Sequence, residues 1–154
     1  MSLKFIKFTV IILLITSCGY KIVDEKISLD INNIVTSGDR KINYIIKNKL
    51  SSISDKGSKK QVKLTINSKK TKTIKEKNVR NQITKYRIKI VTEIKLMNTL
   101  NSNTKEFYVL KEGDYNVGDK HSDTITNEKK LVEIMTASIS EKIIERLVNF
   151  KNDI

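Results

Sequence analysis

Few side chains in this sequence could carry out catalysis. The one histidine, His121, lies in a polar stretch that we expect to be a loop before the last helix, where a histidine is usually solvated. Three carboxylates close to it, Asp114, Asp119 and Asp123, suit turn formation and helix capping. The sequence has no Cys/His cluster for zinc, no glycine-rich phosphate loop and no GxSxG motif. We therefore predict no enzyme, no cofactor and no metal site; an enzyme that uses His121 or a carboxylate pair is the less favoured alternative.

The one cysteine, Cys18, has the sequence context of a lipid attachment site. Lys4 and Lys7 form a positive n-region, and residues 8–15 form an apolar segment too short to span a bilayer. The letters ITSC at residues 15–18 match the lipobox, in which an aliphatic residue and two small residues precede the cysteine. We expect diacylation of the Cys18 sulfur, cleavage before Cys18 and acylation of the new amine. A plain secretory signal or a buried N-terminal strand would leave an unpaired thiol, which is unusual in an exported protein.

The lipid signal also sets the domain boundaries and the location that we expect. Residues 1–17 would be a removed signal peptide, and residues 18–154 are a suitable length for a single domain with one core. Two or more acyl chains anchor a protein to a membrane far better than one. Gly19, rather than aspartate, follows the cysteine, and in enterobacterial lipoproteins this favours the outer membrane. We therefore predict a lipid-anchored protein on the periplasmic side of the outer membrane.

The basic residues are concentrated in one part of the chain. The formal net charge is +13 at pH 7, and residues 59–95 hold thirteen basic residues against Glu76 and Glu93. One interpretation is a solvated lysine face, produced by codon bias in a Lys-, Asn- and Ile-rich protein. The other is a site for polyanions, because a concentrated basic patch attracts them. The residues that would form this site are Lys69, Lys70, Lys72, Lys75, Lys77, Arg80 and Arg87.

Alternating apolar residues predict four strands. Residues 26–31 and 61–67 alternate over short lengths, and residues 83–96 alternate over more than ten, with Lys85, Arg87, Lys89 and Lys95 on the polar face. The last strand covers residues 105–111. Between the second and third strands, residues 68–81 are almost without apolar side chains, so we predict a long hairpin tip there.

Two segments have the apolar spacing of helices. The first would be capped by Ser37 or Asp39 and end near Ser51. The second would run from Ser122 or Asp123 to Asn149. Its apolar face comprises Val132, Met135, Ile139, Ile143 and Leu147, widened by Leu131, Ile134 and Ile144. The expected fold is α+β in the order β-α-β-β-β-α, a two-layer sandwich whose four-stranded, mainly antiparallel sheet is covered on one face by both helices.

With these elements in place, the chain resembles the outer-membrane lipopolysaccharide-assembly lipoproteins (LptE-like). The similarity lies in the start Cys18-Gly19-Tyr20, in the first helix segment IVTSGDRKINYIIKNKL, and in Tyr115 followed by SDTITNEKKLVEIMTASISEKIIERLVNF with its small residues Ala137 and Ser138. The order of elements matches over nearly all of residues 18–150. The chain departs from the family in lacking proline and in having less alanine in the last helix.

The resemblance implies a binding role rather than catalysis. It implies a lipoprotein that plugs the LptD-like assembly barrel of the outer membrane and binds lipopolysaccharide, with the membrane reached through the N-terminal lipid. The alternative is a structural adaptor lipoprotein of another envelope secretion or lipid-transport complex. Nucleic acid is not expected as a partner, because Cys18 places the chain outside the cytoplasm and Tyr86 lies on the apolar side of its strand.

Overall fold

A computed structural model describes residues 27–100 and 102–151 of the chain. The expected signal peptide, Cys18, and the Cys18-Gly19-Tyr20 start lie outside these residues. The elements in chain order are β1 (Asp30–Gly38), α2 (Arg40–Ile53), β2 (Gln61–Lys77), β3 (Ile83–Asn98), β4 (Thr104–Asn116) and α3 (His121–Lys151). This is the predicted order, β-α-β-β-β-α.

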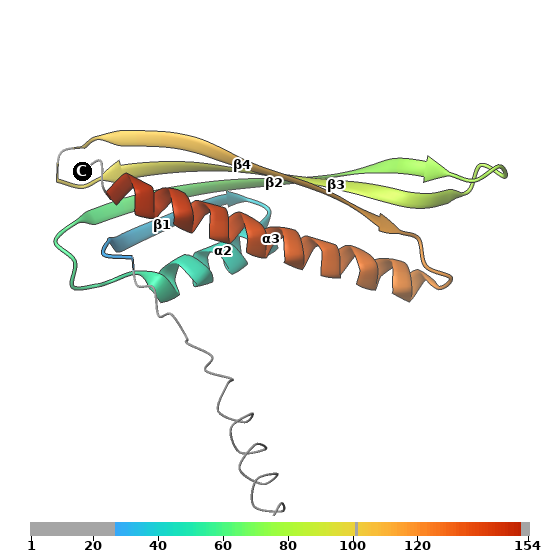
Figure 1. Ribbon diagram of the computed structural model, residues 1–154, viewed down its shortest axis with the longest axis horizontal. Coiled ribbons are helices and arrows are strands. Elements are labelled where there is room, and N and C mark those ends of the chain that lie inside the picture. The colour runs from blue at the N-terminus through green and yellow to red at the C-terminus, as the bar shows by residue number, and fades with distance from the viewer. Residues whose placement is uncertain (1–26, 101, 152–154) are drawn as a thin grey trace, which may run out of the picture.

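The four strands form one mixed sheet in the order β1-β2-β3-β4. β1 is parallel to β2, with Asp30 opposite Gln61 and Gly38 opposite Ser68, whereas β2–β3 and β3–β4 are antiparallel. Both helices lie on one face of this sheet, and the β2–β3 hairpin projects past the other elements (Figure 1). The α+β two-layer sandwich with a mainly antiparallel sheet is therefore confirmed.

The core lies between the sheet and the two helices. Alternate residues of β2 and β3 are buried against helix residues that repeat every three or four positions. All five residues predicted for the main apolar face of α3 are buried. Ile134 does not widen that face, because its side chain is 59% exposed, whereas Leu131 and Ile144 pack against the core. The fully buried large side chains include Leu29, Ile42, Ile46, Leu50, Leu64, Ile66, Ile88, Ile90, Ile94, Leu96, Ile139 and Ile143.

The turn from β1 into α2 is built from two adjacent residues. Gly38 has a φ of 86°, and a side chain there would meet the carbonyl oxygen of Ser68. Asp39 is the N-cap of α2, and its Oδ1 accepts hydrogen bonds from the backbone N–H of Lys41 and of Ile42, both at 3.1 Å. The prediction of a cap at Ser37 or Asp39 thus resolves to Asp39, while Ser37 belongs to β1.

Several predicted boundaries were wrong. The first strand begins at Asp30 and not at residue 26, because Ile27 makes only an isolated bridge to Ser54. Pairing with β2 continues to Gly38, although most side chains after Ile31 are exposed. Residues 68–77 are strand and not hairpin tip, because they pair with β3, with register shifts only after Ile74. β4 extends to Asn116, and His121 is the first residue of α3 rather than a loop residue.

Candidate functional site

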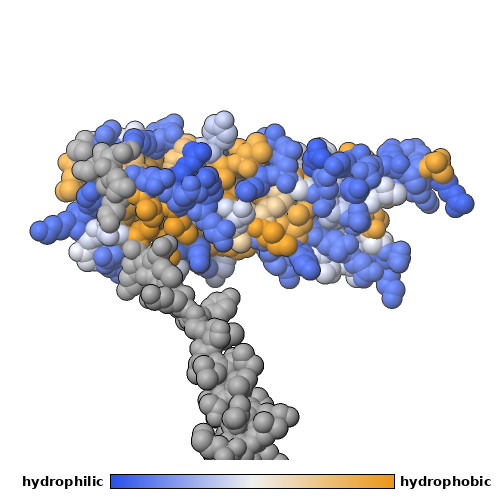
Figure 2. Space-filling model, in the orientation of Figure 1, coloured by the Kyte–Doolittle hydropathy of each residue, from blue (hydrophilic) through white to orange (hydrophobic). Residues whose placement is uncertain are grey.

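The predicted basic residues lie mainly on one half of strand β2. We call residues 61–68 the apolar half of β2 and residues 69–77 the basic half. The apolar half lies between β1 and β3, but β1 ends opposite Ser68, so within the described residues the basic half pairs with β3 alone. Figure 2 shows this projecting end as mainly hydrophilic, with a hydrophobic spot at its tip. The basic half is therefore a sheet edge that faces solvent.

On the face of the sheet that carries the helices, a carboxylate from α3 meets two of these lysines. Glu128 Oε2 accepts hydrogen bonds from Lys72 Nζ at 2.7 Å and from the Tyr115 hydroxyl at 2.8 Å. Its Oε1 lies 3.4 Å from Lys70 Nζ. The Lys72 ammonium also lies 4.2 Å from the ring centre of Tyr86. We call Lys70, Lys72, Tyr115 and Glu128 the Glu128 cluster.

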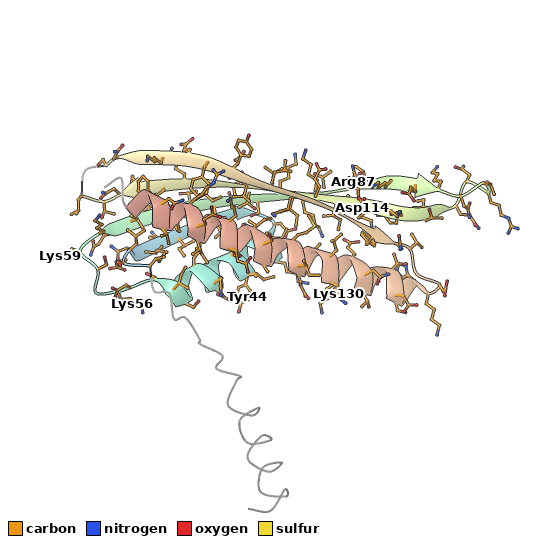
Figure 3. The ribbon with its side chains drawn as sticks, viewed as in Figure 1. Tyr44, Lys56, Lys59, Arg87, Asp114 and Lys130 are labelled. Carbon is orange, nitrogen blue, oxygen red and sulfur yellow. The ribbon has the colours of Figure 1, made fainter. Side chains whose placement is uncertain are left out.

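On the opposite face, a carboxylate from β4 joins β2 to β3. Asp114 Oδ1 lies 2.8 Å from Arg87 Nε and its Oδ2 lies 3.2 Å from Arg87 Nη2, so the guanidinium binds both oxygens. Lys75 binds the same carboxylate. Arg87 and Asp114 lie next to one another where β4 turns toward α3 (Figure 3). Asp114 was predicted to shape a turn or cap a helix; it instead holds two cations across three strands.

Three further cations of the outer face form a ladder of ion pairs. Each partner lies directly opposite on the neighbouring strand, because the register places unlike charges side by side. The pairs are Lys85–Glu76, Lys89–Glu112 and Lys95–Glu106. At least seven of the thirteen basic residues of the segment are therefore paired, mostly with carboxylates from β4 and α3. The outer face does present Lys85, Arg87, Lys89 and Lys95, as predicted, but not as free charges.

Only part of the predicted basic set remains free. Within the described part of the chain, the side chains of Lys69 and Arg80 have no partner, and Lys77 donates only to the Asn81 amide oxygen at 2.9 Å. The turn that carries Arg80 is held by Asn78, whose Oδ1 accepts from the backbone N–H of Arg80 and of Gln82, both at 3.0 Å. The fully exposed Val79 lies in the same turn. The free cations thus lie along the edge and at the tip of the hairpin.

The paired groups have shifted pKa values. Hydrogen bonds from Arg87 and Lys75 hold the pKa of Asp114 well below its usual range, and the hydrogen bond to Asp114 raises the pKa of Arg87. The hydrogen bond from Lys72 lowers the pKa of Glu128. Burial alone would lower the pKa of Lys72, but hydrogen bonds to Glu128 and Tyr115 outweigh it and raise the pKa to about 12. All of these groups are therefore charged at neutral pH.

The sequence interpretation missed Tyr115 and Glu128 as parts of this site. Tyr115 directly follows Asp114 in β4, so the two side chains point to opposite faces of the sheet and serve opposite clusters. A prediction of β4 as far as Asn116 would have indicated, from this alternation, that Asp114 and Tyr115 belong to opposite faces of the sheet. Glu128 carried no signal, because its place beside Lys72 depends on how α3 crosses the sheet.

Three further observations concern surface depressions, metal ligands and membrane spans among the described residues. A shallow depression of about 510 Å³ lies on the outer face and is lined by Val91, Lys95, Glu106 and Tyr108 among others. No group of three or more His, Cys, Asp or Glu side chains within residues 27–100 and 102–151 is arranged to hold a metal. Neither helix that the structure describes is both long and apolar enough to cross a membrane.

Comparison with known proteins defines the class of fold. No protein-family model and no curated protein matches the sequence. Solved structures do match: rare lipoprotein B from Shewanella oneidensis has a TM-score of 0.62 at 10% identity, covering 79% of this chain and 98% of that one. A protein from Caulobacter crescentus classed as a lipoprotein has a TM-score of 0.55 at 15% identity, covering 78% and 90%. Lipoprotein B from Nitrosomonas europaea has a TM-score of 0.51 at 11% identity, covering 82% and 89%.

These similarities show that the chain has the fold of the rare lipoprotein B structures. The match extends over nearly the whole of each solved chain, so it includes the sheet and both helices rather than one motif.

Proposed function

We propose that the protein is an outer-membrane lipoprotein, anchored through Cys18 and facing the periplasm, that binds lipopolysaccharide and is the partner and plug of an assembly barrel. The observation that carries the proposal is the rare lipoprotein B fold combined with a projecting, cation-edged hairpin. The lipobox at residues 15–18 supports the anchor. The binding surface would be the basic half of β2, the hairpin tip and Arg87 of β3; its residues are Lys69, Lys70, Lys72, Lys75, Lys77, Arg80 and Arg87.

The arrangement suits a phosphate-bearing lipid surface. The cations lie on an edge without a neighbouring strand, so a large, flat ligand can approach several of them at once. Each lysine near an anionic lipid surface contributes about 1 kcal/mol to the free energy of binding. Lysines also protect exposed sheet edges from pairing with other strands, and this structural role would be independent of any ligand. The two roles are separated by measuring binding.

The first experiment exchanges free cations. The triple change Lys69→Gln, Lys77→Gln and Arg80→Gln removes charges that hold no carboxylate, so the fold should be unchanged. We expect binding of the detergent-solubilised full-length protein to lipopolysaccharide to weaken by at least about tenfold. Adding Lys70→Gln, Lys72→Gln and Lys75→Gln should weaken it further. Fluorescence anisotropy with labelled lipopolysaccharide measures the affinity.

A matched control removes three exposed lysines from the other end of the molecule. Lys47, Lys49 and Lys56 lie on or just after α2, away from the hairpin, and Figure 3 labels Lys56 there. Their replacement by glutamine should change the affinity less than about twofold. Equal losses in both triples would mean that charge alone, not the hairpin, determines binding. The barrel partner is tested separately, by asking whether a large β-barrel protein co-purifies with the tagged lipoprotein from solubilised outer membranes.

A further inference from the structure

The Glu128 carboxylate occupies the place that a ligand phosphate would take. Its two oxygens receive two ammonium groups and one hydroxyl from two different strands. Two lysines and a tyrosine hydroxyl are suitable donors for a phosphate group, which carries up to two negative charges and accepts several hydrogen bonds. The two lysine donors are also accessible, since the side chains of Lys70 and Lys72 are about a third exposed, whereas Tyr115 is buried. The cluster is thus a set of hydrogen-bond donors suited to an anion, and the Glu128 carboxylate is the anion that they bind in this structure.

Glu128 differs from Asp114 in how firmly it is held. Asp114 is part of the sheet, and its short side chain is gripped by a two-point guanidinium contact. Glu128 comes from a separate helix, has a longer side chain, and binds through one short ammonium contact, one hydroxyl and one contact at 3.4 Å. A rotation of its side chain toward solvent would free all three donors without moving the backbone. Asp114 could not leave without breaking the bridge between three strands.

We infer that Lys70, Lys72 and Tyr115 form a phosphate-binding site whose resident Glu128 carboxylate must be displaced by the ligand. The ligand class is a phosphate monoester or pyrophosphate, whether free or on a lipid headgroup. The inference rests on the proposed function for the identity of the lipid, but not for the existence of the site. Glu128 would then make the site selective for anion charge: a dianionic phosphate can displace the carboxylate, whereas a singly charged anion cannot.

The test compares two variants with the same chemical change. Glu128→Gln removes the resident charge, and Glu112→Gln removes a carboxylate that pairs with Lys89 at 3.3 Å on the outer face. Both raise the net charge by one, so non-specific attraction increases equally. We expect Glu128→Gln to tighten binding of inorganic pyrophosphate by about fivefold or more and Glu112→Gln by less than about twofold. Isothermal titration with the full-length protein gives the affinities.

A second variant tests whether the gain uses the proposed donors. Adding Lys72→Gln to Glu128→Gln should abolish the gain, whereas adding Lys89→Gln should leave it. In amide NMR spectra, pyrophosphate should shift residues 70–72 and 115 and leave residue 89 unchanged. Equal affinities of the Glu128→Gln and Glu112→Gln proteins, or a gain that survives Lys72→Gln, would overturn the site.

Binding experiments with lipopolysaccharide test this site separately from the proposed function. Native lipopolysaccharide should show the Glu128→Gln gain, and enzymatically dephosphorylated lipopolysaccharide should not. A gain with pyrophosphate but no binding of either lipopolysaccharide would support the site and contradict the proposed function. Lipopolysaccharide binding without a Glu128→Gln gain in either ligand would support the function and overturn the site.

Discussion

The two halves of strand β2 differ in what surrounds them although both belong to one continuous strand. In the apolar half, Val62, Leu64 and Ile66 face the helices and are buried. In the basic half, the same face carries Lys70, Lys72 and Ile74, and all three are exposed. The boundary is Ser68, whose hydroxyl shares a buried hydrogen bond of 3.0 Å with that of Thr92. Hydrophobic burial stabilises one half, and charged contacts to β4 and α3 organise the other.

The difference between the halves comes from β1 and α2. Both elements cover only the part of the sheet up to Ser68, because β1 ends at Gly38 and the chain turns there into α2. Past that point, α3 is the one described element that lies against this face of the sheet, so β3 remains buried at Ile88 and Ile90 while their partners Lys72 and Lys70 are not. One strand thus serves as core at one end and as a charged edge at the other.

The largest effect should come from deleting buried volume in the apolar half. Leu64→Ala removes a fully buried side chain, and we expect a loss of about 2–5 kcal/mol in the free energy of unfolding. Ile74→Ala, on the same face of the basic half, removes a side chain that is 52% exposed and should cost less than about 1 kcal/mol. Urea unfolding monitored by circular dichroism measures both. Similar losses in the two variants would contradict the division of β2.

A smaller effect is expected at the boundary itself. Gly38→Ala places a side chain against the Ser68 carbonyl at a positive φ, so we expect destabilisation of about 1–3 kcal/mol. Gly57→Ala is the control, because its new methyl would meet only Asp55 Oδ1 at an ordinary 3.6 Å. Thermal unfolding should show a lower midpoint temperature for Gly38→Ala and an unchanged midpoint temperature for Gly57→Ala. Equal midpoints would mean that the close approach of β1 to β2 at Ser68 is dispensable.

The apolar half and the helices that cover it could be predicted from sequence. Alternation in β2 and β3 and the three-to-four spacing in α3 repeat the geometry of strands and helices directly, so Val62, Leu64 and Val132 fall where the pattern places them. The errors in the first two strands have a common cause. Residues 30–38 and 68–77 form strands through backbone pairing, and their mostly polar side chains give no periodic signal.

The site could be predicted only in part, because the carboxylates that pair with its cations are distant in the sequence. The sequence indicates where the cations are, but the carboxylates that neutralise them are far away in the chain: Asp114 lies 39 residues from Lys75, and Glu128 lies 56 from Lys72. Their pairing follows from strand register and from the crossing of α3. The basic segment therefore appeared as a uniform patch in the sequence. Of the seven residues predicted to form the site, the described part of the folded protein leaves Lys69, Arg80 and the weakly paired Lys77 without a carboxylate partner.

The smallest effect concerns pH and is specific to the basic half. The pKa of Glu128 is lowered from its ordinary 4.5 by Lys72, so its contribution to stability is fully present above that value and is lost as the pH falls through the lower, folded-state pKa. Asp114 has the same sign, since its pKa also lies below the ordinary value. The wild type should therefore lose stability between about pH 6 and about pH 3.5, and Glu128→Gln should lose less over that interval.

Urea unfolding at the two pH values measures this difference, and the apolar half provides the contrast. Leu64→Ala lowers stability at both pH values alike and should retain the full acid dependence, because it touches no titrating group. Glu128 is partly exposed, so the difference between wild type and Glu128→Gln should be below about 1 kcal/mol. If Glu128→Gln loses as much stability in acid as the wild type, then the Glu128 cluster does not help to hold the basic half of β2, and the ion pairs of the outer face must do so instead.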